Sequence, residues 1–241
     1  MLYSSIENSK IKDINKLKIK KERDKQGLFL IEGKHLIKEA NKYHLLKKVL
    51  VDESYTLEEE VDAEVMTCSS KVMKFLSELD TPSKVIGVCK KSLGELKGNR
   101  ILLLDNIQDP GNLGTIIRSS LAFNVDTIVL SKDTVDLYNP KVVRATQGML
   151  FKQNIIVSDL RECLNFLEDY TKYATKVDGG ENLDNIKFED KVAIVMGNEG
   201  NGVSNGVLSL CDKYLYIKMN SSVESLNVAV AASIILYELD K

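Results

Sequence analysis

The turn at residues 197–202, with the sequence GNEGNG, combines three glycines with one carboxylate, Glu199. It follows the apolar run 192–196, which is typical of a strand buried on both faces of a parallel sheet. In open α/β sheets ligands bind at the carboxyl ends of strands, and glycines let a backbone approach a ligand closely. No Lys-Ser or Lys-Thr pair follows, so the turn is not a P-loop. We interpret it as a ligand-binding loop with one acidic side chain.

A second polar turn, Ser225-Leu226-Asn227, precedes an almost entirely apolar segment, residues 228–236. A helix that is apolar all round must be buried against a sheet or a partner subunit. Two interpretations of the turn remain open. Either Ser225 or Asn227 only caps the helix by accepting backbone N–H bonds, or both side chains also belong to a binding site.

A third polar group, residues 105–114, follows a predicted strand and runs into a helix that carries Arg118. In one interpretation Asn112 only caps this helix. In the other, Asn112 and Arg118, six residues apart, project toward the same carboxyl edge of the sheet. An arginine there is suited to hold a phosphate through two parallel hydrogen bonds, which a packing role does not require.

The composition excludes several other kinds of site. Only two histidines, His35 and His44, are present, and both lie far along the chain from these turns. The turns therefore cannot contain a Ser-His-Asp triad or a histidine-ligated metal from their own residues. The four cysteines form no CxxC pair, which favours reduced, packed thiols over disulfides or zinc ligands. We expect no metal site.

The overall balance is that of a globular protein, with 44% hydrophobic and 28% charged residues among 241. A formal net charge of −2 gives no global signature of nucleic-acid binding, which usually needs a strongly basic face. No apolar run approaches the ~20 residues that cross a bilayer, and the first residues show no signal-peptide pattern. We expect a cytoplasmic protein without membrane contact.

The amino-terminal part, residues 1–92, is predicted to form a small α/β domain. It begins with a lysine-rich amphipathic helix at residues 10–25, which is either a solvated surface or a phosphate-contacting face. Helices are predicted at residues 33–43 and 69–79. Strands are predicted at residues 28–31, 48–51, 64–67 and 84–89. The mixed, glycine-containing segment 90–99 is the predicted linker.

The second predicted domain, residues 99–241, alternates strands with helices. Helices are predicted at residues 113–123, 139–148 and 160–170. Strands are predicted at residues 101–104, 127–130, 155–157, 173–177 and 192–196. Such alternation favours an α/β fold, with a parallel sheet covered by helices on both faces.

The three polar groups resemble, in order and spacing, the three motifs of the SpoU-type, or TrmH-like, RNA ribose methyltransferases of the SPOUT superfamily. The first motif is similar to DPGNLGTIIR at residues 109–118, and the second to VMGNEGNGVS at residues 195–204. The third is similar to IKMNSSVESLNVAVA at residues 217–231. The segment FLIEGKHLIKEA, residues 29–40, also resembles the RNA substrate-binding domain often fused to this family.

This resemblance implies a deep trefoil knot in the carboxyl-terminal domain, S-adenosyl-L-methionine as cofactor, RNA as substrate and a homodimer that shares the active site. The catalytic positions that it implies are Asn112, Arg118, Glu199, Ser225 and Asn227. The cofactor-binding positions that it implies are Gly197, Ile217, Met219 and Leu226. The sequence departs from the family pattern at Lys218, where proline is usual, and at Ser221, where glycine is usual.

The implied reaction is methyl transfer to a ribose 2′-hydroxyl, with ribosomal RNA favoured over transfer RNA because of the amino-terminal domain. Arg118 is expected to clamp a phosphate and to stabilise a developing alkoxide, because a guanidinium stays protonated and cannot accept the proton. Glu199 either holds Arg118 or shapes its loop. The alternatives are a non-catalytic knotted RNA-binding protein and a doubly wound nucleotide-binding enzyme, although no GxGxxG follows a first strand.

Overall fold

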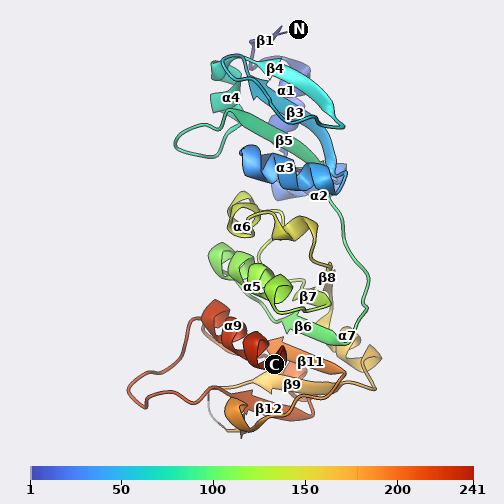
Figure 1. Cartoon of the computed structure of the whole chain (residues 1–241), viewed down its shortest axis with the longest axis vertical. Coiled ribbons are helices and arrows are strands. Elements are labelled where there is room, and N and C mark those ends of the chain that lie inside the picture. The colour runs from blue at the N-terminus through green and yellow to red at the C-terminus, as the bar shows by residue number, and fades with distance from the viewer. Residues whose placement is uncertain (1, 178) are drawn as a thin grey trace. The chain divides into compact units, whose positions relative to one another are not determined.

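The computed structural model describes residues 2–177 and 179–241, and Figure 1 labels their helices and strands. The chain forms two compact units. The first contains the chain up to Ser92 together with Asp136–Phe151, and the second contains Leu93–Val135 and Lys152–Lys241. The chain first passes from one unit to the other between Ser92 and Leu93, near the expected boundaries at residues 92 and 99. It then returns to the first unit for residues 136–151, a segment here called the excursion.

The first unit is built on a mixed five-stranded sheet with the order β1-β4-β3-β5-β2. β1 and β3 pair with β4 in parallel, whereas β5 is antiparallel to β3 and β2. Its strands are β1 Leu2–Tyr3, β2 Leu28–Glu32, β3 Leu46–Asp52, β4 Glu64–Cys68 and β5 Val85–Lys90. The four predicted strands are confirmed, and β1, too short for a pattern, was not predicted.

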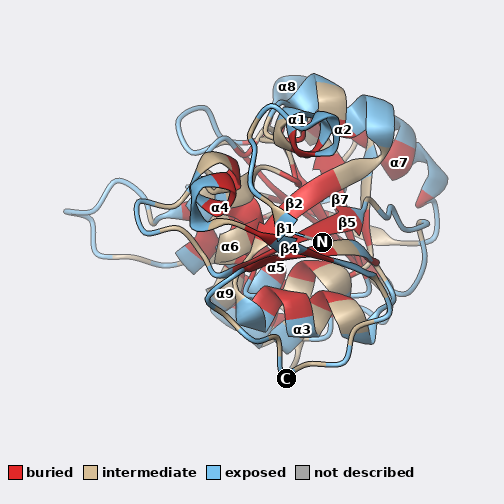
Figure 2. Ribbon diagram, turned by 90° about the horizontal axis from the view of Figure 1, so that it is seen from above, coloured by how far each residue is buried: buried red, intermediate tan, exposed pale blue. Residues whose placement is uncertain are grey.

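Helices cover this sheet, and the three at residues 9–16, 34–42 and 70–76 present apolar residues at helical spacing. α1 and α4 share one core with Leu50 and Ile86 of the sheet, while α3 buries Leu36 and Ile37. Figure 2 shows the burial along the strands and on the inner sides of the helices. The helices are α1 Ser9–Lys16, α2 Lys20–Gln26, α3 Lys34–Lys42 and α4 Ser70–Leu76, followed later in the chain by α6 Pro140–Ala145 and the 3-10 turn η1 Met149–Phe151.

The predicted single helix at residues 10–25 is wrong, because the chain breaks it into α1 and α2. Leu17 ends α1 and Ile19 precedes α2 in an extended conformation. Arg23 is also not a surface cation, since only 4% of the residue is exposed. Its guanidinium is therefore paired inside the first unit and is not available to bind a phosphate.

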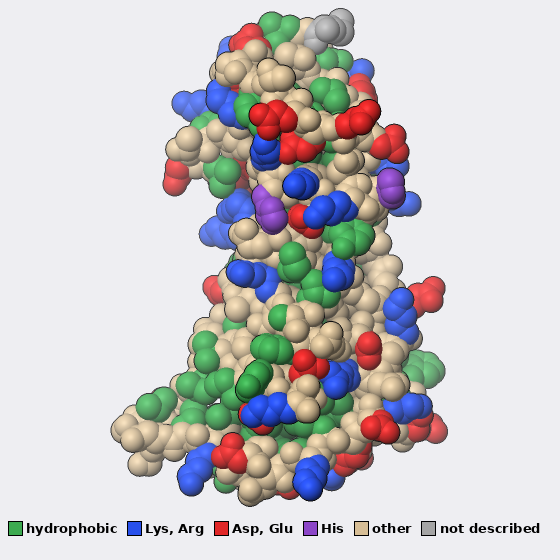
Figure 3. Space-filling view, viewed as in Figure 1, with side chains coloured by type: hydrophobic (Ala, Val, Ile, Leu, Met, Phe, Trp, Pro, Cys, Tyr) green, Lys and Arg blue, Asp and Glu red, His purple; other side chains and the backbone are tan. Residues whose placement is uncertain are grey.

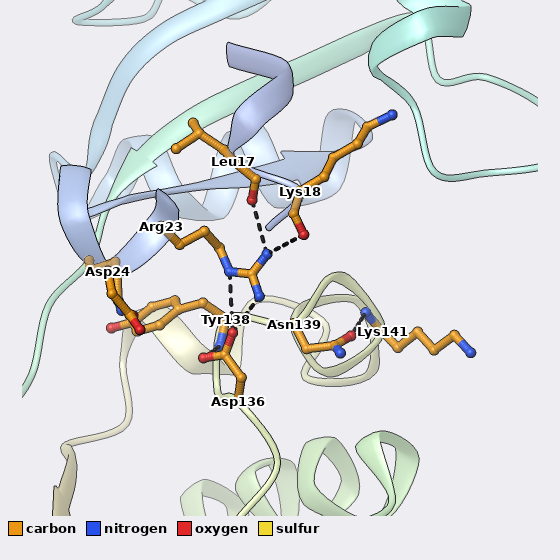
Figure 4. Close-up of polar contacts among 9 residues, drawn as sticks. Leu17, Lys18, Arg23, Asp24, Asp136, Tyr138, Asn139 and Lys141 are labelled. Carbon is orange, nitrogen blue, oxygen red and sulfur yellow. Dashed lines mark hydrogen bonds and ion pairs between the residues drawn. The ribbon is translucent and has the colours of Figure 1, made fainter. Parts of the chain in front are cut away.

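Arg23 holds the excursion of residues 136–151 in the first unit, as Figure 4 shows. Its Nη2 donates to Asp136 Oδ2 at 2.5 Å, and its Nη1 donates to the carbonyls of Leu17 and Lys18 at 2.9 and 2.7 Å. Next along the excursion, the Tyr138 ring packs on Phe29 with centroids 4.6 Å apart. The excursion is thus fixed by a satisfied buried ion pair beside an aromatic contact.

The second unit contains a seven-stranded sheet with the order β10-β12-β9-β11-β6-β7-β8, in which every pairing is parallel. Its strands are β6 Arg100–Leu104, β7 Thr127–Ser131, β8 Ile155–Ser158, β9 Thr171–Thr175, β10 Glu181–Asn182, β11 Val192–Met196 and β12 Lys213–Tyr216. The predicted parallel α/β sheet is confirmed, with β9 displaced by two residues. β10 and β12 were not predicted.

Helices lie on both faces of this sheet, as the strand–helix alternation predicts (Figure 1). α7 and α8 pack on Leu103 and Val195, while α5 and α9 pack against each other through a 2.7 Å hydrogen bond between Ser119 and Ser233. The helices are α5 Pro110–Ala122, α7 Leu160–Phe166, α8 Asn205–Leu208 and α9 Val228–Leu239, with the 3-10 turn η2 Leu183–Asn185.

Replacing Asp136 with alanine should destabilise the first unit by about 3 kcal/mol, because Arg23 would keep its charge in a buried place without its acidic partner. The side chains of this pair are only 5% and 13% exposed. Asp13→Ala is the matched control, since Asp13 is 63% exposed in its pair with Lys16 and should change stability by less than about 1 kcal/mol. Denaturant unfolding measures both. Equal effects of the two substitutions would contradict the anchoring role of Arg23.

Candidate active site at the carboxyl edge of the parallel sheet

A cavity of about 320 Å³ lies where β9, β11 and β12 end. The carboxyl edge of an open parallel sheet is the usual place for a ligand, and the volume is within the range of small-molecule sites. Apolar side chains from the sheet and from α9 form much of its wall, among them Met196, Leu215 and Ile235. The four predicted cofactor-binding residues all line it, namely Gly197, Ile217, Met219 and Leu226.

The segment 217–227 reaches the cavity despite its departures from the family pattern. Lys218 and Ser221 are exposed, while Ile217 and Met219 are half-buried in the cavity wall. Asn220 closes the following turn by accepting from the backbone N–H of Ser222 at 2.9 Å. Ile217 and Met219 thus face the cavity with Lys218 exposed between them, and Ser221 lies in the exposed turn that follows.

Gly197 is the one position in the second motif where a side chain has no room. A Cβ atom there would meet backbone atoms of Gly202 and Val203 at 2.1 Å. The close approach belongs to a small antiparallel bridge in which Asn198 and Gly202 exchange backbone hydrogen bonds at 3.0 and 2.9 Å. Gly197 therefore permits the loop to fold back on itself beside the cavity.

Three polar side chains join the three motifs in one network. Asn112 donates from Nδ2 to Glu199 Oε1 at 3.0 Å, and its Oδ1 accepts from Asn227 Nδ2 at 2.9 Å. The Asn227 Oδ1 accepts from the backbone N–H groups of Ala229 and Val230 at the start of α9. Asn227 therefore caps α9 and also belongs to this network, so capping is not its whole role.

The expectation that Asn112 caps its helix is wrong. α5 begins three residues earlier than predicted, with Pro110 in its first turn and Asp109 as the N-cap. Asp109 accepts from the Asn112 backbone N–H at 2.8 Å. Because the cap is supplied by Asp109, the amide group of Asn112 is free to connect Glu199 with Asn227.

Glu199 shapes the first-motif loop. Besides Asn112, its carboxylate accepts from the backbone N–H groups of Gln108 and Asp109, each at 3.3 Å. Partial burial raises the pKa of Glu199, but the hydrogen bonds from Asn112 and from backbone N–H groups outweigh it and hold the pKa below the ordinary 4.5. The carboxylate is consequently ionised at neutral pH.

Arg118 is not brought to this network within one chain. In α5 it lies six residues after Asn112, which rotates its side chain away from that residue by roughly a third of a turn. It is exposed, and across residues 2–177 and 179–241 no carboxylate or carbonyl binds its guanidinium. Within one chain Glu199 therefore does not hold Arg118, and Ser225 lines the cavity without a hydrogen bond in the same described residues.

Two site residues were missed by the sequence analysis. Asp105, 8% exposed, accepts from the Ser204 backbone N–H at 2.8 Å, and Asn198 donates to the Asn106 carbonyl at 2.8 Å. Both fasten the loop after β6 to the loop after β11. The sequence did contain a signal for these two contacts. Polar residues directly follow two buried strands, and when such strands are neighbours their polar residues must be paired by hydrogen bonds.

The described residues offer neither a metal centre nor a spanning helix. No group of three or more His, Cys, Asp or Glu within residues 2–177 and 179–241 is placed to hold a metal ion. Among the helices of those same ranges, none has the length and apolarity to cross a membrane.

Glu199→Gln should lower the stability of the second unit by about 1 kcal/mol at pH 7, a modest cost because the carboxylate is partly solvated. The folded pKa lies below the unfolded one, so the stabilisation exists above the ordinary pKa of 4.5 and is lost as the pH falls through the folded value. Denaturant titrations of both proteins from pH 7 to pH 3 measure the difference, which should shrink toward zero. A difference independent of pH would contradict the ionic role.

The comparisons with known proteins cover nearly the whole chain. The profile of the SpoU rRNA Methylase family matches residues 99–237, and that of the MRM3-like substrate binding domain matches residues 8–87. A 23S rRNA (guanosine(2553)-2′-O)-methyltransferase, RlmP, of Bacillus subtilis is 36% identical, over 98% of this chain and 97% of the relative.

Solved structures agree with this match. The SpoU methyltransferase AviRb from Streptomyces viridochromogenes, in complex with AdoMet, superposes with a TM-score of 0.88 at 26% identity, over 97% of each chain. An AdoMet-bound rRNA methyltransferase from Sinorhizobium meliloti gives 0.87 at 26% identity, over 99% of this chain and 96% of that one. By its matched motifs, its fold and its full-length relatives, the chain belongs to the SpoU rRNA methylase family.

Proposed function

We propose that this protein transfers a methyl group from S-adenosyl-L-methionine to a ribose 2′-hydroxyl of ribosomal RNA, with 23S rRNA as the first choice. The observation that carries the proposal is the cavity at the carboxyl edge, bordered by the network of Asn112, Glu199 and Asn227. The full-length similarity to RlmP favours ribosomal over transfer RNA. The same substrate supports a cytoplasmic location for the enzyme.

The cavity suits S-adenosyl-L-methionine in size and chemistry. Apolar walls from Ile217, Met219 and Leu226 are suited to a purine, and the loop at Gly197 adds backbone groups for hydrogen bonds. The cofactor supplies a methyl group on a sulfonium and departs as a neutral thioether, so the reaction needs no general acid. Help is needed only at the ribose hydroxyl, which must lose its proton.

The residues around the cavity divide this work. Glu199 is ionised, but its oxygens already accept from Asn112, Gln108 and Asp109, so it organises the loop and does not act as a base. Asn112 and Asn227 orient each other, and Ser225 remains available at the wall. Arg118 supplies the cation that clamps the adjacent phosphate and stabilises the developing alkoxide. The phosphate or solvent accepts the proton of the ribose hydroxyl.

Arg118 performs this role from a partner subunit. Along α9, Val230, Ile234 and Tyr237 form an apolar stripe that is 49%, 37% and 53% exposed, and Thr115 of α5 borders the same open groove. Arg118 follows Thr115 by three residues, so it lies on the same side of α5. A second copy covering the stripe would bury it and carry each arginine toward the other cavity.

The remaining fold proposal is the trefoil knot. The family implies this knot. The segment from β12 through residues 217–227 to α9 would be the part of the chain that threads through it. The hydrogen bond that ties Asn227 to Asn112 supports a path in which the end of this segment is held against the first turns of α5.

Arg118→Ala should keep the fold and cofactor binding but lower the methylation rate by roughly 10²-fold, because the developing negative charge loses its cation. Arg118→Lys should recover little, since an ammonium cannot form the bidentate fork. Transfer of tritium from labelled cofactor into 23S rRNA gives the rate, and nucleoside mass spectrometry identifies the methylated atom.

A 2′-deoxy nucleotide at the target should stop the reaction while RNA still binds. Label on a base, or an undiminished rate in Arg118→Ala, would overturn the assignment.

Light scattering should return twice the 27.0 kDa of one chain, and Ile234→Asp should convert the protein to monomers. Phe166→Asp is the matched control, because Phe166 is 80% exposed on α7, outside the stripe, and its loss should leave the dimer intact.

Mixing Arg118→Ala with Asn112→Ala tests the shared site in the same protein. If Arg118 acts across the interface, each mixed dimer regains one complete site, and random exchange restores about a quarter of wild-type activity. No recovery on mixing, or a monomer that methylates RNA when dilute, would remove the shared site.

A further inference from the structure

The first-motif loop, residues 105–109, is set apart by its hydrogen bonds and not by charge. Basic and acidic side chains are interspersed over much of the displayed face of the molecule, so charge singles out no surface there (Figure 3). The loop, by contrast, is fastened on two sides. The loop after β11 holds it through Asn198, Glu199 and Ser204. Residues 131–135, at the end of the neighbouring strand β7, hold its other side.

Asn106 turns this loop sharply. Its backbone is in the left-handed region, with a φ of 60°, which asparagine adopts more readily than most side chains. Its N–H group donates to the Ser131 hydroxyl at 2.9 Å, and its carbonyl accepts from Asn198 Nδ2 at 2.8 Å. The two backbone N–H groups that donate to Glu199 follow within three residues of this fixed turn.

The side chain of Gln108 closes the turn. Its Nε2 donates to the Asp133 carbonyl at 2.7 Å and also to the side-chain oxygen of Asn106. These two bonds use both N–H groups of the amide. Turning the amide over would place its oxygen against the Asp133 carbonyl, which can only accept. Gln108 thereby ties the loop after β7 to the first-motif loop.

The lengths of these bonds show which contact controls the other. The backbone N–H groups of Gln108 and Asp109 lie 3.3 Å from the Glu199 oxygens, at the long end of the range for such bonds. The bond from the Gln108 amide to Asp133 is short for its class. A small displacement of the loop would break the two long bonds, so they depend on the short one.

We propose that Gln108 is a positioning residue for methyl transfer, because its amide holds the first-motif loop where the loop can bind Glu199. Through Glu199 the effect reaches Asn112, which donates to the same carboxylate at 3.0 Å and accepts from Asn227. Gln108 is not among the described residues that line the cavity, so cofactor binding does not depend on it directly. This role rests on the proposed function, since it orders the site of that same reaction.

The test compares Gln108→Met, which keeps the length of the side chain but removes both donors, with Gln26→Met as the matched control. Gln26 is an exposed glutamine of α2 whose amide donates to Glu22 of the same helix at 3.4 Å. Single-turnover transfer of tritium from labelled S-adenosyl-L-methionine into 23S rRNA fragments gives the rate, and calorimetry gives the cofactor affinity. Gln108→Met should lower the rate by about tenfold, the loss expected from one well-placed hydrogen bond, with cofactor affinity unchanged. The control should change neither quantity.

A combined variant separates positioning from direct contact with the substrate. Gln108→Met together with Glu199→Ala should be no slower than Glu199→Ala alone, because Gln108 acts through that carboxylate. Three results would each overturn the positioning role: losses that multiply in the combined variant, an unchanged rate in Gln108→Met, or weaker RNA binding by Gln108→Met.

Denaturant unfolding of the same proteins gives a readout that needs neither cofactor nor RNA. The changes in unfolding midpoint caused by Gln108→Met and Glu199→Ala should not add in the combined variant. Additive changes would contradict the coupling between the two residues. Wild-type protein that neither binds nor methylates the RNA would instead remove the proposed function. The unfolding comparison would still decide the coupling in that case, so the two failures are distinguishable.

Discussion

The carboxamide of Asn112 is the point on which the candidate site depends. It donates to Glu199 and accepts from Asn227, so a single planar group joins the loops after β6 and β11 to the start of α9. Each partner has further bonds, Glu199 to the backbone of the first motif and Asn227 to the first turn of α9. An amide suits this place because it donates and accepts at once, whereas a carboxylate at position 112 would repel Glu199.

This network also defines what the site can do chemically. The ionised carboxylate already accepts from several donors, the Asn112 amide donates to Glu199 and accepts from Asn227, and no histidine stands in the motifs. The site is therefore a rigid frame beside a largely apolar cavity, and its polar groups orient partners more than they move protons. A sulfonium methyl donor fits such a frame, because its leaving group requires no proton.

Much of the fold was predictable from the sequence, since the parallel strands β6, β7, β8 and β11 are short apolar runs bounded by polar turns. β12 was not predicted, because its sequence KYLY alternates weakly and carries a lysine at its start. The motif residues were found by type and spacing, and the structure brings Asn112, Glu199 and Asn227 together. Arg118 stays outside that network. The sequence analysis assumed that positions 112 and 118 point to one edge, but the rotation of the helix over six residues turns the two side chains apart. The helix at residues 10–25 was interpreted as a solvated or phosphate-contacting face, but its Arg23 is buried. A periodic pattern of charges does not reveal which cation is paired in the interior with a distant residue such as Asp136.

The return of residues 136–151 to the first unit has a consequence for how the protein is made. Phe29, 1% exposed, packs against Tyr138 and Phe151, so part of its cover is translated more than a hundred residues after it. At about 5–20 residues per second, a ribosome needs several seconds to pass from the end of β5 to Phe151. During that interval the nascent first unit lacks the partner of Arg23 and exposes an aromatic ring. Its completion on the ribosome is therefore tied to synthesis of the strands β6 and β7, and a fragment ending at residue 92 is an unfinished domain.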